Sequence, residues 1–361
     1  MHLFQLQFHP DIFLSGQLPL AVWALIALAL LFDFLNGLHD AANSVATVVS
    51  TRVLRPFTAV IWAAVFNFLA FVIFPTKVAD TIQSDVVNPH VITSQLIAAT
   101  LIAACAWNVL TWYLGLPTSS SHALIGGMVG AALAETRFNG GDLRWDGLGL
   151  IIAFIFLAPI IGGVFGVAIA TAVSWIFRRS PPRWVDRLFR RAQLVSAGLF
   201  SLGHGGNDAQ KTMGIIFALL IASARQTGRF APPAAVPLEV VLACYLAMGL
   251  GTMFGGWRIV KTMGQGIIRL RPVDGFCAET AAAGVLALTT FVKGIPISTT
   301  HTIMGAIVGV GSLKRLSAVR WIVAGRVVWA WFLTLPGAGV MAFLAWWLLQ
   351  GLGWAGSLVW G

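Results

Sequence analysis

The sequence has few charged residues. They make up only 10% of the 361 residues, whereas hydrophobic residues make up 58%. Soluble domains carry about 25% charged residues, so this composition excludes a water-soluble globular protein. Apolar runs close to the ~20 residues that cross a bilayer recur along the whole chain, and the ~10-residue alternating segments of a transmembrane barrel do not occur. The sequence therefore predicts an all-α polytopic membrane protein.

Cysteine is also scarce. Cys105, Cys244 and Cys277 are isolated and fall within or beside apolar runs, so their spacing fits neither a disulfide framework nor a metal site. We expect no cofactor. The first residues, "MHLFQLQFHPDIF", lack the basic start, apolar core and small-residue cleavage site of a signal peptide, and we expect them in the mature chain.

Acidic residues are outnumbered by basic ones, 13 to 23, which gives a net charge of +10. The basic residues lie mainly in loops, and the stretch 177–191 holds six arginines and one aspartate. Such a bias is typical of the cytoplasmic loops of membrane proteins, so it does not indicate a nucleic-acid partner. The sequence predicts a multi-pass protein of the cell inner (plasma) membrane.

Hydropathy predicts ten apolar segments. The first, sixth and last are long, which leaves the number of spans between about 10 and 12. The fourth and ninth have only 16 residues each, and such short segments are typical of broken or re-entrant transporter helices. The segments are 20–50, 56–75, 91–114, 119–134, 147–176, 192–222, 237–257, 278–294, 298–313 and 319–350.

Two pairs of motifs show an internal duplication. A shift of 168 residues aligns "NGLHDAANSVAT" (36–47) with "HGGNDAQKTMG" (204–214) and Asp40 with Asp208. A shift of 179 aligns "LPTSSSHALIGGMVG" (116–130) with "IPISTTHTIMGAIVG" (295–309). Both pairs occur in the same order, so we interpret the chain as two repeats.

The number of segments predicts that the second repeat is inverted. Each half holds five apolar segments, with Asp40 in the first and Asp208 in the sixth, and an odd number per half turns the second copy upside down. Loops 52–55, 177–191, 258–271 and 314–320 are basic and lie on one predicted side. Loops 76–90 and 135–146, which hold five of the 13 acidic residues, lie on the other side, and loop 223–236 is an exception. Inverted repeats meet at a midplane substrate site. We expect an N-terminal segment 1–19, a first repeat 20–176, a basic cytoplasmic linker 177–191, an inverted repeat 192–350 and a tail 351–361.

The first pair of motifs places carboxylates inside apolar segments. Asn36, Asp40 and Asn43 share one helix face, with His39 beside them. His204, Asp208 and Lys211 have the same spacing in the second copy, with Asn207 beside them. A carboxylate in hydrocarbon costs at least ~2.5 kcal/mol, so we expect the two faces to meet in one polar site. The alternative is an internal polar network that only holds helices together.

The second pair of motifs has the opposite chemistry. In "PTSSSH" (117–122) and "ISTTH" (297–301), a run of hydroxyl residues precedes a Gly-rich helix. Helices that begin inside the membrane present free N–H groups to an anion. The alternative is that these hydroxyls are ordinary N-caps. The anion-binding hydroxyl candidates are Ser119, Ser120, Ser121, Ser298, Thr299 and Thr300.

The helix starts attract anions, whereas the carboxylates repel them. The two can form one site if the substrate is an oxyanion that brings a cation or carries a proton. The carboxylates then bind the coupling ion or accept a hydrogen bond from the protonated oxyanion. The residues leave open whether the anion travels free, protonated or as a neutral metal complex. The sequence predicts a secondary transporter and not an enzyme.

At these four motifs the sequence resembles the inorganic phosphate transporter (PiT) family, in particular its bacterial low-affinity members. The resemblance implies symport of inorganic phosphate with Na⁺ or H⁺, an inverted-repeat fold and a homodimer. Carried over by position, it implies that Asp40, Asn43, Asn207 and Asp208 lie at the phosphate and coupling-ion site, with Na⁺ possible at Asp40, Asn43 and Asp208. It also implies that Ser119–Ser121 and Ser298–Thr300 hold phosphate.

One position departs from the sodium-coupled members of that family. They have Asn in both signatures, whereas the second copy here has Lys211 where the first has Asn43. An ammonium is a tethered cation, so we hypothesise that it replaces one sodium ion and contacts phosphate, and that transport is coupled to H⁺ or to fewer sodium ions. The candidate proton carriers are His39, His122, His204, His301 and Glu279.

Three other functions compete with this interpretation. A sulfate permease of the same fold is the nearest, but sulfate has no proton to donate to Asp40 or Asp208. A membrane phosphatase needs a nucleophile and an ester-sized cleft at a water-accessible face. A passive anion channel is disfavoured because buried carboxylates would obstruct it.

Overall fold

The computed structural model describes residues 8–14 and 18–353, and within them the regular structure is helical. The predicted tail largely falls on 354–361, outside this range. The first half of the chain contains α1 (Pro10–Leu14), α2 (Leu20–Ser50), α3 (Pro56–Ile73), α4 (Lys77–Ser84), α5 (Ser94–Leu114), α6 (Ser120–Glu135), the short η2 (Gly140–Asp142) and α7 (Trp145–Ile176). The second half contains α8 (Pro182–Thr227), α9 (Leu238–Phe254), α10 (Trp257–Lys261), η3 (Thr262–Gly266), α11 (Pro272–Leu288), η4 (Thr289–Lys293), α12 (Thr299–Lys314), η5 (Leu316–Ala318) and α13 (Trp321–Gly351).

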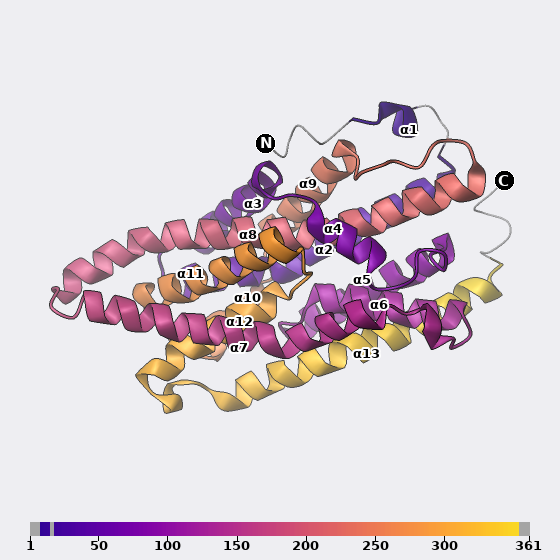
Figure 1. Cartoon of the computed structure of the whole chain (residues 1–361). Helices are drawn as coiled ribbons and strands as arrows, with labels where there is room; N and C mark the ends of the chain where they lie inside the picture. Colours follow the sequence, from indigo (N-terminus) through magenta and orange to yellow (C-terminus); the bar gives the residue numbers. More distant parts are fainter. Residues whose placement is uncertain (1–7, 15–17, 354–361) are drawn as a thin grey trace.

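The long helices form one bundle, and the shorter helices α6, α10 and α12 lie within its length (Figure 1). Of the described helices, five are long and apolar enough to cross a membrane, namely α2, α3, α5, α7 and α13. A sixth candidate is α9 followed by Trp257–Gly264, with a 61° bend between them. Length and composition thus define a multi-pass membrane protein. Helices α6 and α12 have only 16 residues each, about 24 Å, so neither crosses a bilayer alone.

Helix α8 begins ten residues before the predicted boundary at 192. Most of the Arg-rich stretch 177–191 is the first part of this helix, which joins α7 through a tight turn at the left of Figure 1. The reason is that the stretch is amphipathic: Phe189 is buried, while the side chains of Asp186 and Arg190 pair across one exposed helix turn at 2.9 Å. The stretch is therefore a polar extension of a helix that is otherwise buried.

Close helix contacts are arranged alike in the two halves. A Cβ atom added at Gly37 on α2 would lie 2.2 Å from the Met248 carbonyl oxygen on α9, and one added at Gly205 on α8 would lie 2.4 Å from that of Asn67 on α3. Each Asp-bearing helix thus packs directly on the backbone of a helix from the other half. Glycine permits this approach because it has no side chain.

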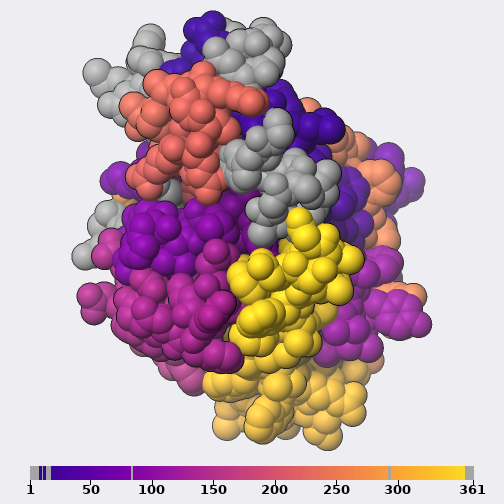
Figure 2. Space-filling view, turned by 90° about the vertical axis from the view of Figure 1, so that its right-hand side faces the viewer, coloured from indigo at the N-terminus to yellow at the C-terminus, as the bar shows by residue number. Residues whose placement is uncertain are grey.

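The same pattern occurs around the two short helices. Helix α6 packs along α13, as the space-filling view shows for the yellow and magenta segments, and α12 packs along α7 (Figure 2). A Cβ atom added at Gly130 would lie 1.9 Å from the Gly339 carbonyl oxygen, and one added at Gly309 would lie 2.4 Å from the Gly163 carbonyl oxygen. Glycine at these two positions therefore permits the close packing of each short helix on its long neighbour.

Candidate functional site

The two short helices begin inside the protein, and both starts have the same cap. The Ser119 hydroxyl accepts a hydrogen bond from the His122 N–H at 3.3 Å, and the Ser298 hydroxyl accepts one from the His301 N–H at 3.2 Å. All of these residues are buried. The N-cap interpretation is therefore right for these two serines, and it fixes where α6 and α12 start.

The two helix starts lie against each other. The Thr300 hydroxyl donates to the Thr118 carbonyl oxygen at 3.2 Å, and the His122 and His301 rings meet edge to face with centroids 4.8 Å apart. The positive ends of two helix dipoles therefore converge in one place. Such a convergence favours a negatively charged ligand.

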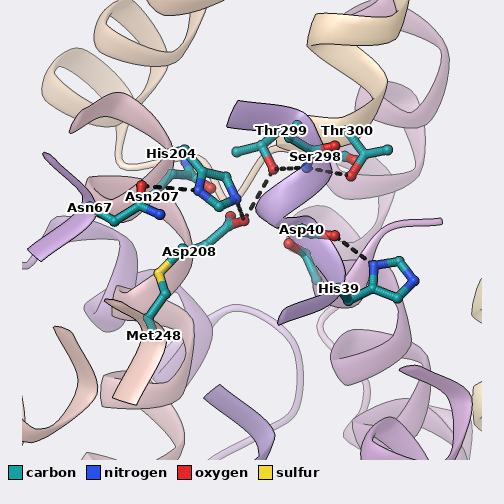
Figure 3. Close-up of polar contacts among 12 residues, drawn as sticks. His39, Asp40, Asn67, His204, Asn207, Asp208, Met248, Ser298, Thr299 and Thr300 are labelled. Atoms are coloured by element: carbon teal, nitrogen blue, oxygen red, sulfur yellow. Dashed lines mark hydrogen bonds and ion pairs between the residues drawn. The ribbon is translucent and has the colours of Figure 1, made fainter. Parts of the chain in front are cut away.

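The two predicted carboxylates approach the same place from opposite sides. Asp40 on α2 and Asp208 on α8 face each other in Figure 3, with 3% and 0% of their surfaces exposed. Together with His204 they place three possible ligand atoms within 4.8 Å of one another. The sequence prediction that the two Asp-bearing faces meet is correct, and this cluster has the composition to hold a cation.

Lys211 lies at the centre of the second half of the site. Its ammonium donates to the Asp208 carboxylate, to the Ser121 hydroxyl and, at 3.1 Å, to the Ile297 carbonyl oxygen. An ammonium has three N–H groups, so each of them has an acceptor. Through these hydrogen bonds, the Lys211 ammonium links the motif on α8 to the segments at the starts of α6 and α12.

Threonine and asparagine side chains make further links between the two kinds of motif. The Thr299 hydroxyl donates to Asp208 Oδ2 at 3.1 Å, and the Asn43 amide donates to the Thr300 hydroxyl at 2.9 Å. The Asn207 amide points elsewhere, toward the Thr290 hydroxyl at 3.2 Å. The carboxylate motifs and the helix starts therefore form one continuous polar site.

Of the four candidate histidines, two contact the carboxylates. His39 Nδ1 lies 2.7 Å from Asp40 Oδ1, with Nε2 3.0 Å from the Thr111 hydroxyl. His204 Nε2 lies 3.1 Å from Asp208 Oδ2. The other two, His122 and His301, make no hydrogen bond or ion pair with either Asp in the described part of the chain. They pack against each other, and His301 also stacks on Trp331 at 3.9 Å between centroids.

Several polar atoms in this region are buried without a hydrogen-bond partner among the described residues. Buried polar groups are nearly always paired, so orphaned atoms at one place indicate where a ligand or water binds. The unpaired atoms at the helix starts and beside the carboxylates are Ser120 Oγ, His122 Nδ1, Asn207 Oδ1 and His301 Nε2.

Glu279 lies in a separate buried cluster. Its carboxylate accepts hydrogen bonds from the Thr47 hydroxyl, from the Ser196 hydroxyl at 2.5 Å and from the Gln193 amide at 3.2 Å. Thr47 is seven residues after Asp40 on the same face of α2, about 10 Å along the helix. The cluster thus lies toward the basic loops and not at the carboxylate pair.

The sequence interpretation missed Asp33. This residue is completely buried and lies seven residues before Asp40 on the same helix face. It follows the apolar run 18–32 directly, and a carboxylate at that point of a predicted span was a sufficient reason to single it out. Thr111 and Asn67, which bind the site histidines, are neutral residues in apolar helices and could only be found from the fold.

A basic cavity of about 890 Å³ opens beside the site, next to the segment Leu114–Leu116 that precedes the start of α6. Its cationic side chains have no ion-pair partner among the described residues. They lie on the side to which the sequence assigns the basic loops. The cations that line it are Arg52, Lys261, Arg269, Arg320 and Arg326.

A bundle of apolar helices with a buried charged site between two half-length helices is the architecture of a membrane transporter. The chain belongs to the phosphate transporter family, whose profile matches residues 36–342. A protein of Rhizobium meliloti (strain 1021) named "Probable low-affinity inorganic phosphate transporter" is 54% identical over 326 residues, which cover 90% of this chain and 95% of the relative. A protein of Bacillus subtilis (strain 168) with the same name is 44% identical, covering 90% and 96%.

A solved structure titled "The sodium-dependent phosphate transporter" has the same fold. It superposes with a TM-score of 0.83 and 24% identity, covering 92% of this chain and 99% of the other. At this level of identity the likeness concerns the fold. The all-α polytopic fold class and the family resemblance predicted from the sequence are both confirmed.

Proposed function

We propose that this protein is a secondary active symporter that imports inorganic phosphate by alternating access around the site described above. The observation that carries this proposal is the meeting of two helix starts with two carboxylates and one lysine in a single buried place. The names of the relatives support phosphate as the substrate. They describe transport and not hydrolysis, which disfavours the phosphatase alternative.

Phosphate binds, in this proposal, at the convergence of α6 and α12. The first-turn N–H groups and the unpaired Ser120 hydroxyl donate to its oxygens, and the Lys211 ammonium balances its charge. A protonated phosphate has an O–H group that donates to Asp40 or Asp208. Sulfate at neutral pH lacks this donor, so the two carboxylates favour phosphate over sulfate.

The coupling ion in this proposal is H⁺. The Lys211 ammonium already contacts a carboxylate, a hydroxyl and a backbone carbonyl, and oxygen atoms of these kinds are the ligands that a hard cation takes. The position equivalent to Lys211 in the first half is Asn43, which brings no charge. We propose that the lysine permanently replaces one cation that sodium-coupled relatives must bind.

Alternating access follows, in this proposal, from two inverted repeats, 20–176 and 192–350. The equivalent contacts Gly37–Met248 and Gly205–Asn67 support a pseudo-two-fold relation, because each joins a helix of one half to the other half. Rocking of one half against the other would then expose the same site to either side. The homodimer implied by the family resemblance stays a prediction.

The test is uptake of radiolabelled phosphate into proteoliposomes, with sodium and pH gradients imposed separately and sulfate present as a competitor. We expect an inward proton gradient to drive accumulation without sodium. The Lys211→Asn variant is measured alongside, and we expect it to acquire a requirement for sodium. Strict sodium dependence of the unmodified protein would contradict proton coupling, and accumulation of sulfate but not phosphate would contradict the substrate.

A further inference from the structure

Asp33 differs from every other carboxylate in the interior of the described protein. Its side chain is completely buried, and neither carboxylate oxygen has a hydrogen-bond partner among the described residues. An ionised carboxylate in this setting has lost its hydration, and only the neighbouring Thr212 and Asn36 side chains are close enough to offset that loss. The same group with a proton attached is neutral and far less costly to bury.

Other polar atoms near Asp33 are also unpaired. The Thr212 hydroxyl on α8 and the Asn36 side chain lie beside Asp33, and Tyr245 on α9 interacts with it. Thr212 Oγ1, Asn36 Oδ1 and Tyr245 Oη have no partner among the described residues. Buried polar atoms are nearly always paired, so a group of unpaired ones at the junction of three helices has the polarity to hold a water molecule or a proton.

The charged groups that face Asp33 set its electrostatic environment. Helix α8 brings Asp208 and Lys211, which compensate each other, and α9 brings the thiol of Cys244 and the phenol of Tyr245. On α2 itself the nearest titratable groups along the chain are His39 and Asp40. Because Lys211 is already neutralised by Asp208, no uncompensated cation stabilises an ionised Asp33.

Glu279 provides a contrast within the same protein. It is equally buried, but its carboxylate accepts three hydrogen bonds from neutral donors. Asp33, Asp40 and Thr47 recur every seven residues along one face of α2, so Asp33 and the Glu279 cluster lie on opposite sides of the central site. The hydrogen-bonded carboxylate is on the basic side and the unpaired one is on the other.

We propose that Asp33 is the proton-loading site of the transporter, on the side of the centre away from the basic loops. It takes one proton from the aqueous phase, is neutral while the site reorients, and releases the proton once its surroundings are hydrated. This inference rests on the proposed phosphate symport. It adds a site that lies outside the duplicated motifs, since the position equivalent to Asp33 in the second half is Ser201.

The test compares two assays on Asp33→Asn in proteoliposomes. The first assay measures phosphate accumulation driven by a pH gradient, and the second measures exchange of labelled for unlabelled phosphate at equal pH. Exchange needs binding and reorientation but no net proton movement. We expect a loss of at least about 10-fold in driven accumulation, with exchange within about 2-fold of the unmodified protein.

Two variants act as controls. Ser201→Ala changes the equivalent position, whose hydroxyl bonds only to its own helix at the Ala197 carbonyl oxygen, and we expect both assays to be unchanged. Asp33→Glu keeps the carboxyl group, and we expect partial recovery of driven accumulation.

If Asp33→Asn lowers both assays equally, or lowers neither, Asp33 is not the proton site. If the unmodified protein moves no phosphate in either assay, the proposed function itself fails. If Asp33→Asn abolished a stimulation of uptake by sodium, Asp33 would bind a sodium ion, and the proposal that it binds a proton would be wrong.

A second inference comes from the segments that lead into α6 and α12. Gly115 and Gly294 occupy equivalent positions and both have left-handed backbones, with φ of 66° and 61°. The Arg258 guanidinium donates to the Tyr113 carbonyl oxygen at 2.7 Å, and the Lys77 ammonium donates to the Phe291 carbonyl oxygen at 3.0 Å. Each cation thus binds a carbonyl two or three residues before one of these glycines.

These two hydrogen bonds occupy corresponding positions in the two halves of the chain. A shift of 181 residues aligns Lys77 with Arg258 and also Asn67 with Met248, the pair whose backbones contact Gly205 and Gly37. The sequence assigns Lys77 and Arg258 to opposite sides of the membrane, and Gly115 lines the basic cavity. We infer that Arg258 and Lys77 are positioning residues that each hold closed the segment covering the site on one side.

The test is the labelling of single cysteines by a membrane-impermeant maleimide. Leu116→Cys and Ile295→Cys report on the two equivalent segments, after subtraction of the labelling of the parent chain. We expect Arg258→Met to raise labelling of Leu116→Cys several-fold while leaving Ile295→Cys unchanged, and Lys77→Met to do the reverse. Arg258→Lys keeps a hydrogen-bond donor, so in this variant we expect Leu116→Cys to be labelled as slowly as it is with Arg258 present. Labelling that changes equally at both reporters, or at neither, would overturn the inference.

Discussion

The two halves of the site place an aspartate at equivalent positions but stabilise it by different means. Asp208 is bound to the Lys211 ammonium and lies beside His204 and the Thr299 hydroxyl. Asp40 is paired with His39, and that histidine also contacts the Thr111 hydroxyl. The second half therefore has an ammonium beside its carboxylate, whereas the first half has an imidazole.

This difference suggests a division of roles within a duplicated fold. The half with lysine provides a fixed charge that does not need to be loaded in each cycle. The first half has Asn43 where the second half has Lys211, so no ammonium lies beside Asp40. Packing, by contrast, is similar on both sides, because the glycine contacts occur in equivalent pairs. The two halves thus share their packing and differ at a few polar positions.

The largest effect is expected for Asp208→Asn, which leaves a buried ammonium without its carboxylate. Breaking one partner of a buried ion pair costs about 3–5 kcal/mol, so we expect a clear fall in unfolding temperature and loss of phosphate uptake. Adding Lys211→Met to this variant is expected to recover the stability but not the uptake. Asp186→Asn removes an exposed ion pair on the same helix and is expected to cost under about 1 kcal/mol; equal losses in both single variants would contradict the comparison.

Packing is expected to respond equally in the two halves. Gly130→Ala and Gly309→Ala each force a methyl group against a backbone oxygen of a neighbouring helix, and overpacking of this kind costs about 1–3 kcal/mol. Thermal unfolding in detergent measures both. Gly325→Ala is the control, because an added Cβ there meets nothing within 4 Å. Destabilisation in one half alone would show that the two packing interfaces are not equivalent.

Asp40→Asn is expected to lower uptake strongly while changing stability less than Asp208→Asn does. Asp40 has no lysine or arginine partner among the described residues, so its replacement leaves no buried ammonium unpaired. We expect phosphate uptake to fall by about 10-fold or more, equivalent to about 1.4 kcal/mol, with a stability change under about 2 kcal/mol. Uptake kinetics and unfolding are measured on the same preparation. A stability loss as large as that of Asp208→Asn would remove the proposed distinction.

The equivalent hydroxyl positions Ser120 and Thr299 are expected to separate binding from stability. The Ser120 hydroxyl has no protein partner among the described residues, whereas the Thr299 hydroxyl donates to Asp208. Ser120→Ala is expected to raise the half-saturating phosphate concentration about 5-fold at unchanged unfolding temperature, and Thr299→Val to destabilise the protein by about 1 kcal/mol as well. A drop in stability for Ser120→Ala would mean that its hydroxyl holds the fold and not the substrate.

The smallest effect is expected at the basic cavity. Neutralising Arg269 and Arg320 together, as Arg269→Gln with Arg320→Gln, removes two long-range charges without touching the site. We expect a change in transport rate of under about 3-fold that disappears at high salt, since exposed charges are screened over ~10 Å at 0.1 M. Arg183→Gln, outside the cavity lining, is the control. A salt-independent loss would show direct binding by these arginines.

Much of this protein was determined by the sequence alone. The low charge and long apolar runs required a helical membrane protein, because hydrocarbon admits few ionised groups. The repeated motifs located Asp40, Asp208 and the two helix starts, since polar residues inside predicted spans are rare. The period of the helix also placed Asn36, Asp40 and Asn43 on one face. These inferences need only local patterns and the cost of burying charge.

Only the tertiary structure decided which of these groups touch and which have no partner. Lys211 binds Ser121 and Ile297, which lie 90 and 86 residues away, and no local pattern specifies such pairs. The structure also assigned Ser119 and Ser298 to capping, set Glu279 apart from the central site and showed that Asp33 has no hydrogen-bond partner among the described residues. Whether a buried polar group is paired depends on side chains that converge from several helices. The function of a carboxylate is therefore a property of its neighbours in space.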